Sequence, residues 1–411
     1  MRAMKDSGIE CVGDIPVDWS MRRLRFLCFI TTGNQDTQDN DPDGEYPFYV
    51  RSPIVERSHK YTFYGPAILM SGDGAGAGRI FHKVSGKYAC HQRVYSMQNI
   101  HDIDSAFLFY YLRELFPVTL EMANAKSTVD SVRLPMLQDF TVLLPPPAEQ
   151  QRIAAYLDEQ CGEIDKVLAK TRESIEEYKK LKQSVITEAV TKGIRPNRPM
   201  KPSGIEWIGD IPAEWGMRRL KYCAELNPKC DFSDLSTDTY VTFTPMELVG
   251  YGDFQNNAES LGKLSGSYTP FQEGDIVLAK VTPCFENGKI AIMKELHSGV
   301  GFGSSELFVI RAVKINTKFL FYFLQNDGFK DVACSTMTGT GGLKRVSPNF
   351  VHNCPLTVPV SEEQAEIVAY LDQQCAEIDR LIAKKEQIIT ELESYKKSLI
   401  YECVTGKREV E

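Results

Sequence analysis

The stretch SGIECVGDIPVDWSMRRL, residues 7–24, recurs almost unchanged as SGIEWIGDIPAEWGMRRL, residues 203–220. A second pair of similar segments lies further along the chain: IAAYLDEQCGEID begins at Ile153, and IVAYLDQQCAEID begins at Ile367. The similarities are too long and too well ordered to be chance. Self-similarity at this scale identifies two consecutive modules, so the fold is expected to contain the same unit twice.

The middles of the two modules, roughly 25–144 and 221–358, have diverged but keep their order. GPAILMSGDGAGAGRI lies opposite GDIVLAKVTPCFENGKI, and DSAFLFYYL lies opposite NTKFLFYFL. Short β-rich runs bounded by Gly, Pro and Asn predict compact mixed α/β units. Each aromatic run predicts a helix whose rings belong to the core. Because the least similar parts are in the middle, the repeat indicates two specificities rather than one split active site.

Each module ends in a segment with helical periodicity. Pro147 suits the opening turn of the first helix, and Ser361 with Gln364 has the spacing of a capping box. Apolar or neutral residues then recur at alternating steps of four and three, which is the pattern of a coiled coil. They are Leu157, Cys161, Ile164, Leu168, Thr171, Ile175, Tyr178, Val185 and Ala189, and then Leu371, Cys375, Ile378, Ile382, Lys385, Ile389, Leu392, Leu399 and Cys403.

The predicted seam is interrupted at Lys182 and Lys396. Leu181 and Tyr395 stand beside them and are expected to substitute in the seam. The alternative to a coiled coil is a pair of amphipathic helices that each pack only on their own domain. A helix of this length would overhang a domain of about 120 residues, which favours the coiled coil.

The bulk composition is that of a globular protein. The chain has 411 residues, of which 43% are hydrophobic and 25% charged, enough for two or three domains. Its eleven cysteines form no C-x-x-C pair, which indicates thiols in a reducing cytoplasm.

No apolar run is as long as a membrane span, and MRAMKDSGIE lacks the core of a signal peptide. The net charge is −8, but most of the negative charge lies in 146–194 and 361–411, so a local basic face is possible.

The glycine-rich stretch SGDGAGAGRI, Ser71 to Ile80, does not have the spacing of a nucleotide-binding loop. It matches neither G-x-G-x-x-G nor G-x-x-x-x-G-K-[ST]. It follows the strand-like AILM and aligns with KVTPCFENGK, so that Gly78-Arg79 falls opposite Gly288-Lys289. Glycine lets backbone approach a ligand closely, and a cation there suits a phosphate or a guanine edge. The alternative is a tight hairpin with a solvated charge.

A second candidate loop is TGTGGLKRV, residues 338–346, which carries Lys344 and Arg345. The comparable place in the first module reads ANAKSTVDSVR and supplies Lys126, Ser127 and Arg133. Small hydroxyl residues, glycines and cations can contact phosphate through backbone and side chain together. A plain surface loop is the alternative.

The search for catalytic parts is negative. The six histidines show neither H-E-x-x-H nor another metal-binding spacing, and no G-x-S-x-G motif occurs. The tetrapeptide Asn-Pro-Pro-aromatic of an amino-methyltransferase is also missing, since Asn227-Pro228 continues into Lys229-Cys230. The sequence therefore predicts no catalytic residue and no metal ligand.

Taken together, these motifs resemble the specificity subunit of a type I restriction-modification system. The resemblance rests on IPVDWSMRRL and IPAEWGMRRL, on AKVTPCFENGKIA, GFGSSELFVIRA and MTGTGGLKRV, and on PPPAEQQRIAAYLDEQCGEID and PVSEEQAEIVAYLDQQCAEID. It covers the whole chain in the family's order. The first middle departs from it, because SGDGAGAGR stands where the family more commonly has a K-x-T-P-C-F-E-N-G-K run.

The resemblance implies a mixed α/β (α+β) fold with two target-recognition domains joined by two long antiparallel coiled-coil helices, in a pseudo-twofold arrangement. The first domain would span 1–145, the central helix 146–194, the second domain 195–360 and the C-terminal helix 361–411. Each domain would read one half of a bipartite, asymmetric DNA site. The expected DNA-binding residues are Arg79, Lys126, Ser127, Arg133, Lys280, Thr282, Asn287, Lys289, Lys344 and Arg345.

The resemblance also implies the partners, which are double-stranded DNA, two methyltransferase subunits and restriction subunits, with no membrane. The helices would set the unread spacer and dock the methyltransferase subunits. The chain would have no catalytic activity and no cofactor, because S-adenosylmethionine, ATP and Mg would belong to partner subunits. A cytoplasmic location is expected. Two other classes stay open: a stand-alone nuclease acting on DNA, and a coiled-coil scaffold with no DNA role.

Overall fold

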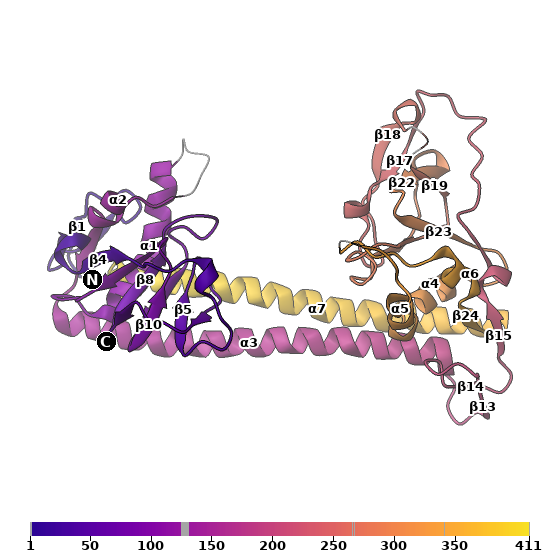
Figure 1. The fold of residues 1–411 in the computed structure, drawn as a ribbon, viewed down its shortest axis with the longest axis horizontal. Helices are drawn as coiled ribbons and strands as arrows, with labels where there is room; N and C mark the ends of the chain where they lie inside the picture. The colour runs from indigo at the N-terminus through magenta and orange to yellow at the C-terminus, as the bar shows by residue number, and fades with distance from the viewer. Residues whose placement is uncertain (1, 125–130, 265, 267, 341, 411) are drawn as a thin grey trace. The chain divides into compact units, whose positions relative to one another are not determined.

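The computed structural model describes residues 2–410 apart from 125–130, 265, 267 and 341. The chain divides into two compact units, of which unit 1 is Met1–Arg172 with Glu386–Glu411 and unit 2 is Glu173–Lys385. Each unit holds a β-rich domain together with part of each of two long helices, α3 (Pro147–Lys192) and α7 (Ser361–Val404) (Figure 1).

Unit 1 holds the first half of the strands in the described chain. They are β1 (Met4–Asp6), β2 (Asp14–Pro16), β3 (Ser20–Arg23), β4 (Phe29–Thr32), β5 (Tyr46–Tyr49), β6 (Glu56–Ser58), β7 (Phe63–Tyr64), β8 (Ala67–Ser71), β9 (Phe81–Val84), β10 (Lys87–Cys90), β11 (Val94–Gln98) and β12 (Thr141–Leu144). The described helices of the β-rich domain are α1 (Ser105–Asn124), α2 (Leu134–Gln138) and the 3-10 turns η1 (Leu24–Phe26) and η2 (Thr37–Asp39).

Unit 2 holds the second half. Its strands are β13 (Met200–Pro202), β14 (Asp210–Pro212), β15 (Gly216–Arg219), β16 (Ala224–Leu226), β17 (Tyr240–Thr244), β18 (Asn257–Ser260), β19 (Thr269–Gln272), β20 (Ile276–Ala279), β21 (Ile290–Ile292), β22 (Val300–Gly303), β23 (Leu307–Ala312) and β24 (Pro355–Val358). The described helices of its β-rich domain are α4 (Thr317–Gln325), α5 (Asp327–Ser335), α6 (Pro348–Asn353) and the 3-10 turns η3 (Leu220–Tyr222), η4 (Met246–Leu248), η5 (Leu261–Lys263) and η6 (His297–Gly299).

The two β-rich domains have the same strand order, although their middle sequences have diverged. One four-stranded sheet runs β4-β11-β8-β9 in unit 1 and β16-β23-β20-β21 in unit 2. The other runs β6-β5-β10-β7 and β18-β17-β22-β19, and two-stranded ribbons pair β3 with β12 and β15 with β24. Every strand of the first domain thus has a counterpart twelve places later. The predicted mixed α/β fold with two repeated domains is confirmed.

Buried strands and aromatic helices form each core. Strands β8 and β20 lie inside their sheets and are buried along their whole length, because apolar clusters cover both faces of their apolar runs AILM and IVLA. The aromatic helices pack on these sheets. In α4 every residue from Phe319 to Gln325 is buried, and in α1 Phe107 and Tyr111 are buried. These rings therefore serve the core, as the sequence predicted.

Helices α3 and α7 pack against each other antiparallel, and both contribute to the core of each unit. In unit 1, Leu157 and Leu168 of α3 share a cluster with Leu399 of α7. In unit 2, Ile186 of α3 shares a cluster with Leu371 of α7. Since neither helix packs only on its own domain, the alternative of two separate amphipathic helices is excluded.

Two lysines occupy the interrupted positions of the apolar seam, and each faces an aspartate of the other helix. Lys182 Nζ lies 2.7 Å from Asp379 Oδ2, and Lys396 Nζ lies 2.6 Å from Asp165 Oδ1. The lysine side chains are only 14% and 11% exposed, whereas the aspartates are 54% and 59% exposed. Each lysine therefore covers the seam with its aliphatic stem and meets its carboxylate at the edge of the seam.

The expectation that Leu181 and Tyr395 replace these lysines in the seam is wrong. Their side chains are 48% and 49% exposed. Each stands one residue before its lysine, and one residue is a rotation of about 100° around a helix, which takes it off the contact face. The long lysine stem can fill a seam position because its charged end reaches a partner outside the seam.

Reversing one of these pairs is expected to destabilise unit 1. Asp165→Lys brings two ammonium groups together and should cost about 1 kcal/mol, since the carboxylate is more than half exposed. Adding Lys396→Asp should restore most of the loss. Urea unfolding in a double-mutant cycle measures the coupling. The exposed pair Glu163–Lys166 on the same helix is the control, with a coupling of roughly 0.3 kcal/mol or less. A coupling for Asp165–Lys396 no larger than this control contradicts the expectation.

A buried carboxylate at the start of each long helix holds the opening segment of a module. In unit 1 Trp19 Nε1 donates to Glu149 Oε2 at 3.1 Å, and Arg2 also donates to Glu149. In unit 2 Trp215 Nε1 donates to Glu363 Oε2 at 2.9 Å, and the guanidinium of Arg198 lies 2.5 Å from Glu363 Oε1. The repeated tryptophans of the opening motif are therefore anchors of the domain on the helix.

The capping box predicted for Ser361 and Gln364 is wrong. Ser361 is already helical, and the side chain of Gln364 does not turn back to it. Instead Gln364 Nε2 donates to the carbonyl of Pro359 at 2.8 Å, and Gln364 Oε1 accepts from the amide of Asn316 at 2.8 Å. This glutamine therefore joins the loop before α4 to the start of α7, a tertiary role that local spacing does not reveal.

Candidate nucleic-acid interface

The fold of unit 2 brings the two predicted loops of the second module together. Residues 280–289 connect β20 to β21, and residues 338–346 lie between α5 and α6. An isolated β-bridge joins Val281 to Arg345. Two segments that are about 60 residues apart in sequence therefore form one surface at the end of the central strands.

Thr282 holds these two loops together. Its hydroxyl donates to the carbonyl of Gly342 at 2.9 Å and accepts from the amide of Lys344 at 2.9 Å. The residue is 8% exposed, and its own amide donates to the carbonyl of Lys344. Both capacities of the hydroxyl are thus used inside the protein, so Thr282 positions Lys344.

The exposed side chains of this surface include cations and polar groups, together with Glu286 and Leu343. Lys344 and Asn287 are exposed to solvent. Arg345 is also exposed, and its guanidinium donates two hydrogen bonds of 2.9 Å to the carboxylate of Glu306, which precedes β23. These hydrogen bonds hold the pKa of Glu306 below its usual value. Glu306 therefore stays ionised at neutral pH and fixes the direction of Arg345.

Lys280 and Lys289 are half-buried, and each donates to backbone. Lys280 Nζ lies 2.5 Å from the carbonyl of Ser305, and Lys289 Nζ lies 2.7 Å from the carbonyl of Met246. Carbonyl partners carry no formal charge that would neutralise an ammonium group, although the charge of Lys280 also helps to lower the pKa of Glu306. Both lysines therefore add positive charge to the surface and also brace the loops around it.

The first unit builds the same arrangement from a different sequence. The glycine-rich loop follows β8, and an isolated β-bridge joins Asp73 to Ser131. Arg79 NH2 lies 3.1 Å from Glu121 Oε1, and Arg133 is exposed at the start of α2. The predicted contact residues Lys126 and Ser127 lie outside the described residues.

The strand register corrects the alignment of the two glycine loops. Ser71 of β8 and Ala279 of β20 are equivalent, because Ile68 and Met70 then face the helix-side core as Ile276 and Leu278 do. The amide of Ser71 donates to the carbonyl of Ile80, and the amide of Ala279 donates to the carbonyl of Lys289. The counterpart of Lys289 is therefore Ile80 and not Arg79. The extra residue of the second module lies inside the loop, where hydrogen bonding does not fix the register.

Hydrogen bonds also align the segment before α2 in unit 1 with the segment before α6 in unit 2. The amide of Val132 donates to the carbonyl of Gly72, and the amide of Val346 donates to the carbonyl of Lys280. This places Ser131 of the first unit at the position of Arg345 in the second. The two surfaces thus share their backbone frame and differ in the side chains that they present.

Two arginines of the first surface were missed by the sequence analysis. Arg51 NH1 lies 3.2 Å and Arg93 Nε lies 3.7 Å from the carboxylate of Asp73, and their side chains are 44% and 65% exposed. Arg93 lies in the turn between β10 and β11, and Glu306 lies in the corresponding turn of unit 2. Both turns directly precede a central strand. A charged residue just before a predicted buried strand is therefore the sequence signal that could have identified Arg93.

Both surfaces have an excess of cations. The first gathers Arg51, Arg79, Arg93 and Arg133 around Asp73 and Glu121. In the second, Arg345 pairs with Glu306, and Lys280, Lys289 and Lys344 lie in the same two loops as the exposed Glu286. Such a surface suits the phosphates and guanine edges of nucleic acid. Among the described residues, no group of three or more His, Cys, Asp or Glu side chains is placed to hold a metal ion. None of the helices in the described part of the chain has the length and apolar content of a membrane span.

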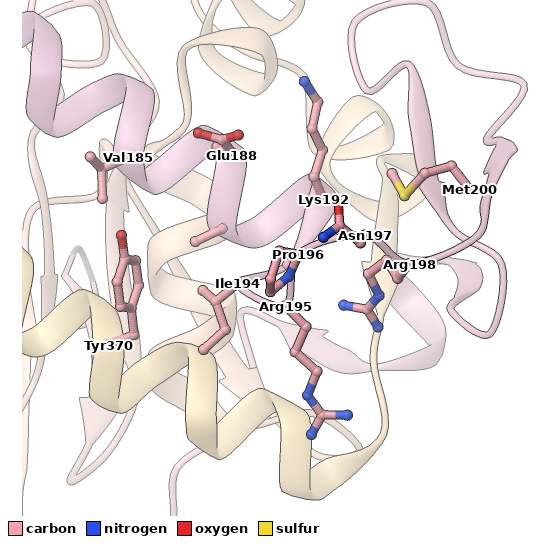
Figure 2. A pocket seen from close by; sticks show the side chains of 12 residues that line it. Val185, Glu188, Lys192, Ile194, Arg195, Pro196, Asn197, Arg198, Met200 and Tyr370 are labelled. Carbon is pink, nitrogen blue, oxygen red and sulfur yellow. The ribbon is translucent and has the colours of Figure 1, made fainter.

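A separate hollow of about 510 Å³ lies in unit 2 where α3 ends (Figure 2). Its two arginines are engaged in ion pairs: Arg195 lies 2.7 Å from Glu366, and Arg198 lies 2.5 Å from Glu363. None of the predicted contact residues lines it. This hollow belongs to the connection between α3 and the second module, so it is not part of the candidate interface.

Comparison with known proteins agrees with this architecture. The chain matches the family described as the type I restriction modification DNA specificity domain over residues 16–177 and 212–394. It is 26% identical to the EcoDI specificity subunit of Escherichia coli, covering 96% of this chain and 90% of that protein. It is also 26% identical to the MjaVIII specificity subunit of Methanocaldococcus jannaschii, covering 96% and 93%.

A chain from a structure of a type I restriction-modification system has a similar fold. The TM-score is 0.70 at 16% identity, and the match covers 96% of this chain and 99% of that one.

The chain belongs to the family of type I restriction-modification DNA specificity proteins. It is a non-catalytic specificity subunit that recognises DNA sequence, and the catalytic activities of the system lie in other subunits. The alternatives of a stand-alone nuclease and of a scaffold without a DNA role are not favoured by these matches.

Proposed function

We propose that each unit reads one half of a bipartite, asymmetric double-stranded DNA site through the paired loops described above. The observation that carries this proposal is that one backbone frame, with identical strand order, presents different side chains in the two units. The side chains that contact base edges determine which DNA sequence is recognised, whereas a common backbone frame holds these side chains at the same depth in the groove. Two different loop sets therefore suit two different half-sites.

The predicted residues take different roles in this proposal. Lys344 and Asn287 are exposed and reach bases, with Arg345 held beside them by Glu306. Lys280 and Lys289 add phosphate contacts, and Thr282 positions the loop. In the first unit the contacts come from Arg79, Arg133, Lys126 and Ser127, joined by Arg51 and Arg93.

The long helices separate the recognition domains. In this proposal residues 1–145 and 195–360 are the recognition domains, and residues 146–194 and 361–411 form the helices that set the unread spacer. The helices also dock two methyltransferase subunits, which the restriction subunits join. The antiparallel pairing of α3 and α7 supports this division, because within each unit the two helices share one apolar seam.

The purified chain alone is expected to bind DNA weakly and neither to methylate nor to cut it. Adding the cognate methyltransferase subunit should give specific binding that weakens steeply with salt. Methyl-transfer and cleavage assays, with and without the partner, test this expectation, and methylome sequencing of a host that carries the system identifies the site. Methyl transfer by the pure chain would contradict it, and so would a complex that binds all sequences equally.

Lys344→Ala is expected to weaken binding to the cognate site by roughly 1–3 kcal/mol and to relax preference at one position of the second half-site. The physical reason is the loss of an exposed charged donor held next to the duplex. Binding to a set of single-base variants measures it, with Lys263→Ala as the control, since Lys263 is exposed and follows β18 of the other four-stranded sheet. An even loss across all sequences would assign Lys344 to phosphate, and no loss would remove it from the interface.

We further propose a cytoplasmic location and no resident cofactor, with S-adenosylmethionine, ATP and Mg bound by partner subunits. All the cysteines are free thiols, and none forms a disulfide. Burial raises the pKa of Cys28 and of Cys354 to about 12, so that these thiols stay protonated and unreactive. Reduced, inert thiols fit a reducing compartment.

A further inference from the structure

Each unit carries an exposed face of cationic and aromatic side chains that the candidate DNA interface does not use. It follows the repeated segment MRRLRF in unit 1 and MRRLKY in unit 2. We call it the basic-aromatic face and define it by Arg23, Arg25, Phe26 and Asp139 in unit 1, and by Arg219, Lys221, Tyr222 and Asn353 in unit 2.

The two copies of this face have the same internal geometry. The Arg25 guanidinium lies over the Phe26 ring at 5.5 Å, and the Lys221 ammonium lies over the Tyr222 ring at 5.4 Å. The rings are 58% and 59% exposed. A cation held over an exposed ring therefore occurs at the same place in both units.

A shared polar partner completes the geometry in each copy. Arg23 and Arg25 both donate to Asp139 at the end of α2. Arg219 and Lys221 both donate to Asn353 at the end of α6, at 3.2 and 3.0 Å. This exposed hydrogen-bond network is thus repeated in the two units as closely as the buried tryptophan–glutamate contacts are. Core packing does not explain its repetition, because strands β3 and β15 are exposed along most of their length.

The face lies at the opposite end of the sheet from the candidate DNA loops. In unit 2, strand β23 begins beside Glu306 of the loop surface and ends at Ala312. The amide of the next residue, Val313, donates to the carbonyl of Cys223 next to Tyr222. Six residues of strand separate the two ends by about 20 Å. A duplex held by the loops therefore does not account for the face.

The chemistry of the face is that of a protein interface. Arginine and aromatic residues dominate the binding energy of such interfaces. In unit 2 the face borders a hollow of about 650 Å³ whose charged side chains are Arg218, Arg219, Lys221, Lys314 and Glu225. This excess of cations is complementary to an acidic partner.

We propose that each basic-aromatic face docks an acidic surface of one methyltransferase subunit and supplements the contact of that subunit with the helices, so that two faces hold two identical copies. A surface that repeats while the DNA loops diverge must serve something that is the same on both sides. The inference rests on the proposed function for the identity of the partner. Because Asp139 replaces Asn353, the face of unit 1 is less positive, and it binds its copy more weakly than the face of unit 2.

The test uses the full chain mixed with the methyltransferase subunit and measures stoichiometry by native mass spectrometry. Arg25→Glu with Phe26→Ala disables one face, and Lys221→Glu with Tyr222→Ala disables the other. The unchanged chain is expected to hold two copies, each double variant one copy, and the combination of all four none. Lys263→Glu with Tyr240→Ala, an equally exposed lysine and tyrosine of unit 2, is the matched control and should hold two.

Several outcomes overturn the proposal. Two copies retained by both double variants at unchanged affinity would remove the face from the docking surface. Two copies retained with a shallower salt dependence of DNA binding would assign the face to phosphates. Thermal unfolding verifies that each variant is folded, and the single change Lys221→Glu, expected to weaken docking at least tenfold, replaces any variant that is not. If the complex of the unsubstituted chain shows no preference among DNA sequences, this result counts against the proposed function. The number of methyltransferase subunits bound still tests the docking proposal in that case.

Discussion

A fragment that ends near residue 200 will pair with a second copy of itself and, with methyltransferase subunits, will mark a palindromic interrupted site. In the full chain the core of unit 1 needs Ile400 and Val404 from α7. In the fragment these are absent, but Ile186 and Val190 of a second copy stand at the equivalent steps of α3. Isologous pairing then gives a twofold dimer with two identical recognition domains, which must read an inverted repeat.

The seam lysines favour the same pairing. Lys396 binds Asp165 in the full chain, and Lys182 of a second fragment can take its place. Light scattering gives the stoichiometry, and methylation mapping gives the site. Lys182→Asp in the fragment is the control that should weaken the dimer, since it sets two carboxylates together. A fragment that stays monomeric, or that marks the original asymmetric sequence, would show that the modules are not interchangeable halves.

Glu363→Ala will destabilise unit 2 by about 1–3 kcal/mol, because it leaves buried donors without their acceptor. Glu363 is 1% exposed and accepts from Trp215 and Arg198, whose side chain is only 8% exposed. Without the carboxylate, the indole N–H loses its acceptor, and the guanidinium keeps only its ion pair with the exposed Glu214. Denaturant unfolding, followed by tryptophan fluorescence, measures the loss.

The neighbouring residue provides the control for this prediction. Glu362 is in the same turn of α7 but exposed, so Glu362→Ala should change stability by less than about 0.5 kcal/mol. Glu363→Gln keeps an acceptor for Trp215 and loses only the charge. Its loss of stability should therefore lie between those of Glu362→Ala and Glu363→Ala. Equal stability of the Glu362 and Glu363 alanine variants would contradict the role given to the buried carboxylate.

The sequence predicted the candidate interface only in outline. The glycine loop and the TGTGGLKRV segment were identified as binding loops, and the fold brings their counterparts together in both units. The sequence did not show that Thr282 is buried between them, nor that Arg51 and Arg93 flank Asp73. These are contacts between segments that only strand pairing brings together. Alignment across an insertion also misplaced Arg79, because register inside a hairpin is set by hydrogen bonds.

What the sequence by itself determined is the repetition: two modules, two mixed α/β domains and two long helices with a shared apolar seam. Repetition and periodicity are properties of the linear sequence, so they can be identified without knowing the three-dimensional course of the chain. The tertiary structure decided which side chains meet across that path. Lys182 and Lys396 stay in the seam, while Leu181 and Tyr395 face solvent, because each lysine finds an aspartate on the opposite helix. Hydropathy along one helix cannot show this choice, since the free energy of burying a lysine depends on a charge supplied by the other helix.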